Sequence, residues 1–288
     1  MNMKKITLLM LLAAMLTNGW AQSFYITTYQ DCGKNRPITG TENGYTWVNL
    51  GLPSGLKWAT CNVGAANPWD YGDYFAWGET VGYGKNDPSN ANNQSCTGGS
   101  TVKTGYSWCT YKYCSGTSFN TLTKYSTNTS GIYGSVVDNK TTLDLADDAA
   151  AVNMGGSWRM PTIEEQQELK ANCYWEWTDS YNGKGVAGYI VYKVKNASDK
   201  GEVKPTSGSV TTVGSYSLAD PHIFLPAAGY RYGSGLSGAG GNGNYWSSSL
   251  YDYGSDPNYA YSLIFSSDRV GWDGSYRYYG PSVRAVVE

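Results

Sequence analysis

The clearest structural signal in this chain is the sequence Gly156-Ser-Trp-Arg-Met-Pro-Thr-Ile-Glu-Glu165. A threonine directly before a helix can accept a hydrogen bond from the third helical amide, and a glutamate at that third position can bond back to the threonine amide. Thr162 and Glu165 have this spacing. The pattern predicts a helix that starts after Thr162 and runs to about Asn172.

Working outward from this helix, the chain shows one more helical pattern and several strand patterns. Leucine and alanine recur at helical spacing over residues 142–154, and Gly155-Gly156 ends that run. Strands are predicted over residues 45–50, 56–63, 72–77, 188–195, 222–227, 244–250, 259–266 and 282–287. Strands on both sides of two helices indicate an α+β domain with antiparallel sheets.

The start of the chain has the pattern of an export signal. Residues 1–5 are basic, residues 6–16 are apolar, and small residues precede a cut expected after Ala21. The apolar run is too short to span roughly 30 Å of hydrocarbon. We therefore expect a signal peptide over 1–21, a lead-in segment over 22–44, and a domain over 45–288. No span is expected after cleavage, and the protein is expected to be secreted or held at the cell surface.

Composition excludes several functions. The formal net charge is -2, so no whole-chain basic field exists to hold nucleic acid. His222 is the single histidine, which rules out a multi-histidine metal site, and its position after Asp220-Pro221 is typical of a turn. Acidic residues at 144, 147, 148, 164 and 165 lie at helix starts and are expected to cap them. We expect no enzyme activity, no metal and no cofactor.

The chain has six cysteines, and export would permit disulfides. Cys61 and Cys173 lie in the best-patterned segments and are the first choice for a long-range bridge. The other four lie in or before residues 82–140, which are rich in Ser, Thr, Asn, Gly and Tyr. We predict that this stretch is a long insertion of surface loops tied down by disulfides.

Six segments together resemble one known family. They are Leu50-Gly-Leu-Pro-Ser-Gly-Leu-Lys-Trp-Ala-Thr-Cys-Asn-Val-Gly-Ala65, Tyr71-Gly-Asp-Tyr-Phe-Ala-Trp-Gly-Glu-Thr80, Gly156-Ser-Trp-Arg-Met-Pro-Thr162, Phe224-Leu-Pro-Ala-Ala-Gly-Tyr230, Tyr245-Trp-Ser-Ser-Ser249 and Ser282-Val-Arg-Ala-Val286. The set is similar to the Fibrobacter succinogenes major paralogous domain. The resemblance implies a C-type-lectin-like fold related to formylglycine-generating enzymes, with Arg159 and Arg284 as structural residues, partly buried and paired.

Two activities associated with that fold lack their motifs here. Asp256-Pro257-Asn258 and Trp272-Asp273-Gly274 resemble the calcium-binding motifs of true C-type lectins only in part and do not match them. Formylglycine-generating enzymes use a cysteine pair late in the fold, whereas this chain has no cysteine after Cys173. Calcium-dependent sugar binding and oxidation of a substrate cysteine are therefore not expected.

The stretch from Leu250 to Gly280 has an unusual composition. Of its 31 residues, 21 are Tyr, Ser, Asp, Asn or Gly, and none is Lys or Glu. This is the composition of antibody paratopes, in which tyrosine supplies contact area at a low entropy cost. Lysine is depleted from interfaces. The composition also resembles the variable region of proteins diversified by retroelements, several of which have a C-type-lectin-like fold.

We therefore expect a secreted or surface-displayed ligand-binding protein, adhesin-like or receptor-like, whose partner is a protein or a glycan at a cell surface. The predicted ligand-binding residues are Tyr251, Tyr253, Asp256, Asn258, Tyr259, Tyr261, Asp268, Trp272, Asp273, Ser275, Tyr276, Tyr278 and Tyr279. Trp246, Leu263 and Phe265 are expected in the core. The alternatives are a carbohydrate-binding module, a degenerate enzyme of the formylglycine-generating type, and a tyrosine-rich sheet surface without a particular partner.

Overall fold

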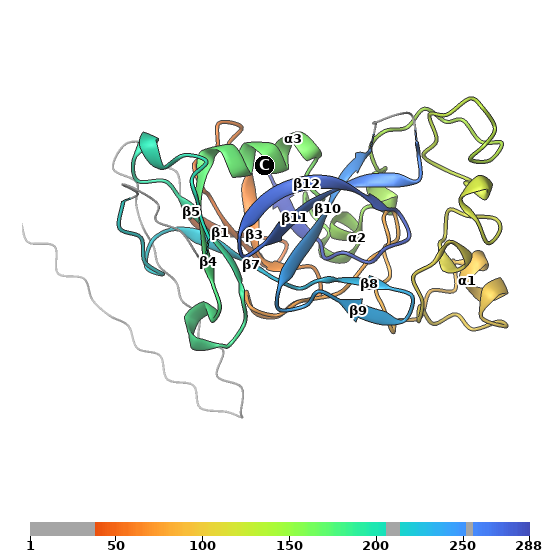
Figure 1. Ribbon diagram of the computed structural model, residues 1–288, viewed down its shortest axis with the longest axis horizontal. Helices are drawn as coiled ribbons and strands as arrows, with labels where there is room; N and C mark the ends of the chain where they lie inside the picture. The colour runs from red at the N-terminus through yellow and green to blue at the C-terminus, as the bar shows by residue number, and fades with distance from the viewer. Residues whose placement is uncertain (1–37, 206–213, 252–255) are drawn as a thin grey trace, which may run out of the picture.

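The computed structural model describes residues 38–205, 214–251 and 256–288. The expected signal peptide, most of the lead-in segment and Tyr253 lie outside these residues. The described residues form a mixed, sheet-rich α+β fold, as the element pattern predicted (Figure 1). None of the helices within them is long and apolar enough to cross a membrane.

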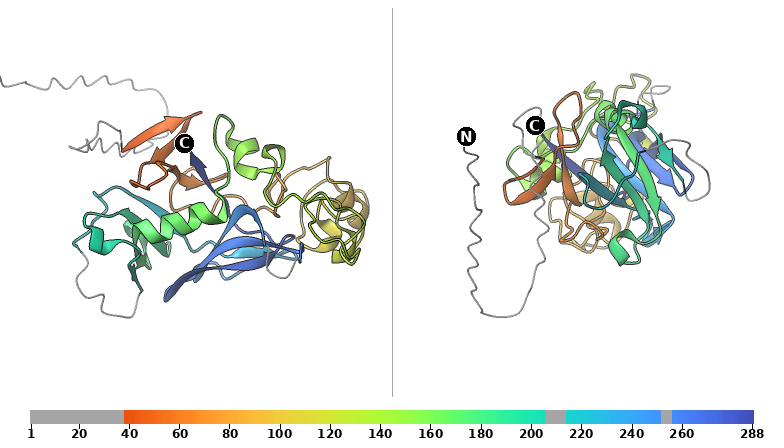
Figure 2. Two further views of the ribbon diagram at one scale, coloured as in Figure 1. Left: turned by 90° about the horizontal axis from the view of Figure 1, so that it is seen from above. Right: turned by 90° about the vertical axis from the view of Figure 1, so that its left-hand side faces the viewer.

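The first sheet joins the two ends of the described chain. Its strand order is β1 (Thr39–Glu42), β2 (Tyr45–Val48), β3 (Lys57–Asn62) and β13 (Arg284–Val287), with β13 antiparallel to β3. The C-terminus consequently lies beside the first described strands (Figure 2). The predicted strands at 45–50, 56–63 and 282–287 are confirmed, whereas residues 72–77 are not a strand. They form a buried extended segment whose backbone bonds to the chain near β12 and β13.

Helix α3 (Ile163–Asn172) begins where the sequence predicted. The Thr162 hydroxyl accepts from the Glu165 amide at 3.3 Å, and the Glu165 carboxylate accepts from the Thr162 amide at 2.8 Å. Glu165 also pairs with Arg159, at 2.6 and 2.7 Å. The buried Gln166 amide donates to main-chain oxygens of β10, which fixes the helix against the sheet.

The other predicted helix is shorter than expected. Helix α2 covers Ala149–Met154, and its first turn is capped by the Asp148 carboxylate, which accepts from the amides of Ala150 and Ala151. Residues 145–147 form a 3-10 turn instead. There Asp144 and Asp147 pair with Lys124, so of the three acidic residues only Asp148 acts as a helix cap.

Two further sheets contribute to a shared core. One has the order β6 (Val203–Lys204), β4 (Cys173–Thr178), β5 (Gly188–Lys193) and β7 (His222–Pro226), and the other has β10 (Asn242–Leu250), β11 (Tyr259–Ser266) and β12 (Arg269–Tyr276). Leu263 and Phe265 of β11 pack with aromatic residues of β4 and β5. Trp246 lies in a second core cluster, and all three are buried as predicted. A small hairpin of β8 (Tyr230–Tyr232) and β9 (Gly235–Ser237) lies alongside.

Residues 82–140 are mostly irregular and are tied down by the disulfide between Cys96 and Cys109, as predicted, but their placement on the surface alone is wrong. This insertion gathers at one end of the molecule, around helix α1 (Ala91–Cys96), but it contributes buried Tyr106, Tyr111, Tyr113 and Tyr125 to the main core (Figure 1). A fully buried ion pair of 2.8 Å between Lys103 and Glu79 also holds it. The core of this region is made of tyrosines rather than aliphatic residues, so hydrophobic periodicity did not reveal it.

The predicted bridge between Cys61 and Cys173 is also wrong. Both thiols are free, and the disulfide among the described residues joins Cys96 to Cys109 within the insertion. Cys173 is fully buried beside Leu169 in the core, whereas Cys61 lies half-buried near Ala66. The two strands that carry them belong to different sheets, so the thiols do not meet.

Two fully buried arginines tie distant segments together. The Arg284 guanidinium donates to the Asn62 side chain and to the carbonyls of Ala59 and Phe224, at 2.8 to 3.1 Å. It is structural, as the resemblance implied, but its acceptors are neutral oxygens and not a carboxylate. Burial lowers its pKa, because the charged form loses its hydration.

Arg277 has the same role for the C-terminal end of β12. Its guanidinium donates to the Tyr111 hydroxyl at 3.0 Å and to the carbonyls of Lys124 at 2.9 Å, Tyr125 at 3.1 Å and Pro257 at 2.9 Å. It also lies 5.0 Å from the ring centroid of Trp77. One side chain therefore joins the insertion, the approach to β11 and the turn after β12.

Replacing Arg277 with alanine should destabilise the fold strongly. The change leaves several buried oxygens without a hydrogen-bond donor and creates a cavity. We therefore expect a loss of at least about 3 kcal/mol in the free energy of unfolding. Urea denaturation followed by tryptophan fluorescence measures it. The exposed Arg269→Ala is the matched control, and equal stability of the two variants would contradict the role assigned to Arg277.

Candidate functional site

Six of the predicted ligand-binding residues meet in one group of rings, which three unpredicted residues complete. Each ring lies within 6.5 Å, centroid to centroid, of at least one other ring in the group. We call this group the tyrosine cluster. It consists of Trp108, Tyr230, Tyr232, Tyr251, Tyr259, Tyr261, Tyr276, Tyr278 and Tyr279.

Strand pairing places the first members of the cluster on one face. Tyr259 of β11 lies opposite Tyr276 of β12, and their rings stack with centroids 4.4 Å apart. Tyr261 lies opposite Gly274 and, by strand alternation, on the same face. The Tyr251 ring lies directly over Gly274, where an added β-carbon would be only 3.0 Å from the ring. Its centroid is 4.7 Å from that of Tyr261.

The turn after β12 extends the group toward the β8–β9 hairpin. Tyr278 stacks on Tyr276 at 5.5 Å, and Tyr279 meets Tyr278 edge to face at 4.9 Å. Tyr230 and Tyr232 lie 5.2 and 5.5 Å from Tyr279. A backbone bridge between Arg231 and Gly280 brings the hairpin to this position. The alternation of Tyr230 and Tyr232 marks a strand face, but nothing local indicated its neighbour.

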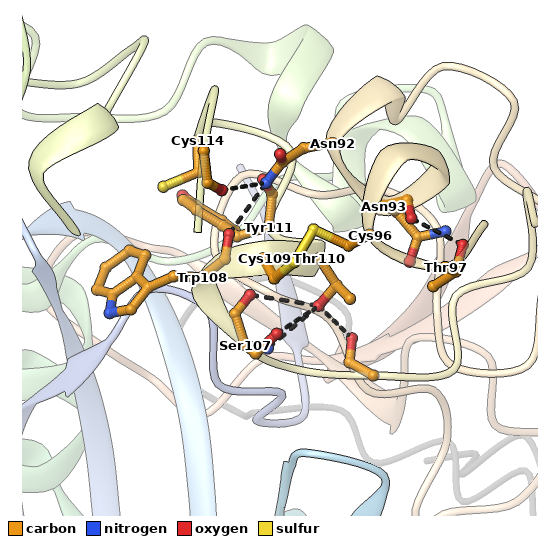
Figure 3. The surroundings of a disulfide bond; sticks show 12 residues. Asn92, Asn93, Cys96, Thr97, Ser107, Trp108, Cys109, Thr110, Tyr111 and Cys114 are labelled. Carbon is orange, nitrogen blue, oxygen red and sulfur yellow. Dashed lines mark hydrogen bonds between the residues drawn. A yellow bond between two sulfur atoms is a disulfide. The ribbon is translucent and has the colours of Figure 1, made fainter. Parts of the chain in front are cut away.

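Trp108 reaches the cluster from the insertion. Its ring lies 4.8 Å from Tyr278 and 6.0 Å from Tyr276. The disulfide between Cys96 and Cys109 joins its short turn to helix α1, and the Asn92 amide donates to the Trp108 and Tyr111 carbonyls, each at 3.0 Å (Figure 3). The disulfide thus positions a ring of the candidate site. The sequence predicted that disulfides tie down this stretch, but it did not indicate that Trp108 joins the cluster.

The surface of the cluster is aromatic, partly accessible and uncharged. Eight of its rings are partly buried and Tyr232 is 57% exposed. Burial raises the pKa of Tyr259, Tyr278 and Tyr279, and neighbouring phenols raise the pKa of Tyr259 and Tyr278 further. Their hydroxyls stay protonated at neutral pH and can both donate and accept hydrogen bonds. The cluster offers apolar rings with neutral polar tips.

The predicted site residues at the β10–β11 connection and at the β11–β12 turn lie outside the tyrosine cluster. Asn258 is only 5% exposed and its carbonyl accepts from the Arg277 amide, so its prediction as a contact residue is wrong. Asp256 accepts from the Asn258 amide at 3.0 Å and shapes the turn. Asp268 is exposed in the β11–β12 turn. It lies beyond Ser266, which is seven residues along β11 from Tyr259 and so about 24 Å away.

The three remaining predicted residues lie on β12 outside the cluster. Trp272 packs against the core beside Val270, with a buried indole nitrogen that has no partner among the described residues. Asp273 is exposed and accepts from the Gly274 amide at 2.8 Å. Ser275 is half-buried, and by alternation it shares the face of Asp273 rather than that of Tyr276.

The single histidine is engaged in structural contacts. His222 donates from Nδ1 to the Asp220 carbonyl at 2.7 Å, and its Nε2 accepts from the Tyr181 hydroxyl at 2.9 Å. Burial lowers its pKa, which keeps the ring neutral. Within 38–205, 214–251 and 256–288, no group of three or more His, Cys, Asp or Glu side chains could hold a metal ion.

Comparison with family models, curated proteins and solved structures finds no match for this chain. Its function must therefore be inferred from its own residues. The tyrosine cluster is the feature of the described surface in which the predicted residues converge.

The raised pKa values make stability sensitive to alkali. Phenols in the unfolded chain ionise near pH 10, whereas those of Tyr259, Tyr278 and Tyr279 ionise higher in the folded state. Their contribution to stability is therefore complete below pH 10 and is lost as the pH rises toward the folded pKa. We expect the free energy of unfolding to fall above pH 10, and to fall less steeply in Tyr259→Phe. Urea denaturation at pH 8, 10 and 11 tests this, and identical slopes for the two proteins would contradict it.

Proposed function

We propose that this protein is an exported ligand-binding protein, secreted or displayed at the cell surface, and that the tyrosine cluster is its binding surface. The observation that supports the proposal is the convergence of nine rings from four separate parts of the chain into one partly exposed, uncharged group. An adhesin-like or receptor-like role follows from the export signal expected at residues 1–21.

Preorganisation is the physical reason that such a surface suits recognition. The rings are held by each other, with stacked pairs at Tyr259–Tyr276 and Tyr276–Tyr278. A partner therefore meets side chains whose rotamers are already restricted, and little conformational entropy is lost on binding. The Arg277 side chain beneath them fixes the turn from which Tyr278 and Tyr279 project.

We further propose that the surface is carried on a C-type-lectin-like fold of the Fibrobacter succinogenes major paralogous domain type. The pairing of β13 with β3, which joins the ends of the domain, and the entry to α3 through Trp158-Arg-Met-Pro-Thr162 support it. Diversification of the region before β13 is part of the same proposal. It is supported by the richness of residues 250–280 in Tyr, Ser, Asp and Gly and by the buried terminal strand that follows.

A glycan is the second candidate ligand. The ring of Tyr232 is largely exposed, at 57%, and an exposed ring at the edge of an aromatic group can stack on the apolar face of a sugar. A protein ligand would instead cover many rings at once, with hot spots at the centre of the cluster. A glycan array and an array of extracellular proteins distinguish these two classes of ligand.

The triple variant Tyr276→Ala, Tyr278→Ala, Tyr279→Ala should bind its ligand at least about a hundredfold more weakly, because buried tyrosines at an interface each contribute on the order of 1–2 kcal/mol or more. The labelled protein would be applied to a glycan array and to an array of extracellular proteins, and affinity measured for each ligand found. Tyr45→Ala, on β2 outside the cluster, is the control.

A second variant guards against loss of fold. Tyr232→Ala removes the most exposed ring of the cluster and should leave the melting temperature unchanged while still weakening binding. If the wild type, the triple variant and Tyr232→Ala bind the ligand equally well, the tyrosine cluster is not the binding surface.

A further inference from the structure

Strand β12 has a free edge. It is the last strand of the sheet β10-β11-β12, and β11 is its sole strand partner among the described residues. None of its eight residues is buried. Exposed edges are usually protected by lysine, proline or a bulge, because their unpaired backbone groups can pair with another strand. The β12 sequence, Arg269-Val-Gly-Trp-Asp-Gly-Ser-Tyr276, has no lysine or proline, and its register with β11 is unbroken.

The ladder shows which backbone groups face outward. The amide of Arg277 donates to the carbonyl of Asn258 at 3.0 Å, so these residues form a hydrogen-bonded pair with β11. Because such pairs alternate along an antiparallel ladder, the intervening residues direct their backbone groups away from β11. These residues are Val270, Trp272 and Gly274. The Gly274 amide agrees with this, since it donates to the Asp273 carboxylate instead of to β11.

The outward-facing segment is complementary to itself. Residues 269–273 read Arg-Val-Gly-Trp-Asp, so a two-fold axis at Gly271 sets a cation opposite an anion and one apolar residue opposite another. In this register the outward-facing Val270 of one copy meets the outward-facing Trp272 of the partner subunit, which is the pairing that backbone hydrogen bonds require.

Space and charge at the edge fit this register. An added β-carbon on Gly271 would have no atom within 4 Å, so the position on the axis is open. Arg269 and Asp273 are exposed, and neither forms an ion pair with another described residue. Across the axis each would face the opposite charge on the partner subunit, on the same face of the joined sheet.

We propose that two copies of this chain associate by antiparallel pairing of their β12 strands, centred on Gly271. The two three-stranded sheets become one continuous sheet. Pairing across such an axis keeps equivalent faces together, so both tyrosine clusters lie on the same side. Tyr276 is five residues from Gly271, or about 17 Å, which sets the two clusters about 34 Å apart. The dimer would therefore present two equivalent binding surfaces in one direction.

Sedimentation velocity of the full mature chain, from about 1 to 100 μM, tests the proposal. We expect a concentration-dependent dimer in the wild type. Arg269→Asp and Asp273→Arg each set like charges opposite one another at both symmetry-related positions, and each should raise the dimer dissociation constant at least about tenfold. The double variant Arg269→Asp, Asp273→Arg restores complementarity and should return the constant toward the wild-type value.

Two further variants sharpen the test. Gly271→Lys places two ammonium groups beside the axis and should abolish the dimer without changing the monomer fold, because the position is open. Glu202→Arg changes the net charge as much as Asp273→Arg does, at an exposed position outside β12, and should leave the dimer unchanged. A wild type that stays monomeric throughout, or a dimer indifferent to both single charge reversals, would overturn the proposal.

Discussion

The buried guanidinium of Arg277 is the constraint on which the C-terminal half of this structure depends. It is held by neutral oxygens from the insertion and from the approach to β11, and by aromatic faces rather than by a carboxylate. Desolvating a cation is costly, so this arrangement is stable only when every donor is satisfied. Because its acceptors come from distant segments, those segments must be in place together, and the turn that carries Tyr278 and Tyr279 is fixed as a result.

The hairpin of β11 and β12 joins two different surfaces in one element. At its open end, Tyr259 and Tyr276 begin an uncharged aromatic group. Toward its closed end, Arg269 and Asp273 are exposed along the edge and form no ion pair with another described residue. The rings suit partners of different chemistry, because a phenol hydroxyl can both donate and accept a hydrogen bond. The charged edge suits one partner, because a pattern complementary to itself selects a second copy in a single register. The two proposed roles, recognition and assembly, thus lie at different ends of one strand pair.

Local patterns were predictive where neighbours in sequence are also neighbours in space. Thr162 and Glu165 cap α3, and Leu263 and Phe265 of β11 lie in the core as predicted. The composition of residues 82–140 predicted loops tied down by disulfides, but it did not predict their contribution to the core, because that contribution comes largely from tyrosines, whose polar tips hide them from a hydrophobic pattern. Asn258 was expected to be accessible for a related reason, since the composition of its surroundings does not reveal that the residue is buried.

The sequence by itself determined which residues could form a recognition surface: residues 250–280 are rich in tyrosine and free of Lys and Glu, and a short strand pattern follows them. Tertiary structure alone decided which of them meet. It added Trp108, Tyr230 and Tyr232 through a disulfide and a backbone bridge, and it left Asp268 and Trp272 outside. The physical reason is that periodicity states which face of a strand a side chain shares, whereas pairing between distant segments depends on hydrogen bonds and packing that no local pattern encodes.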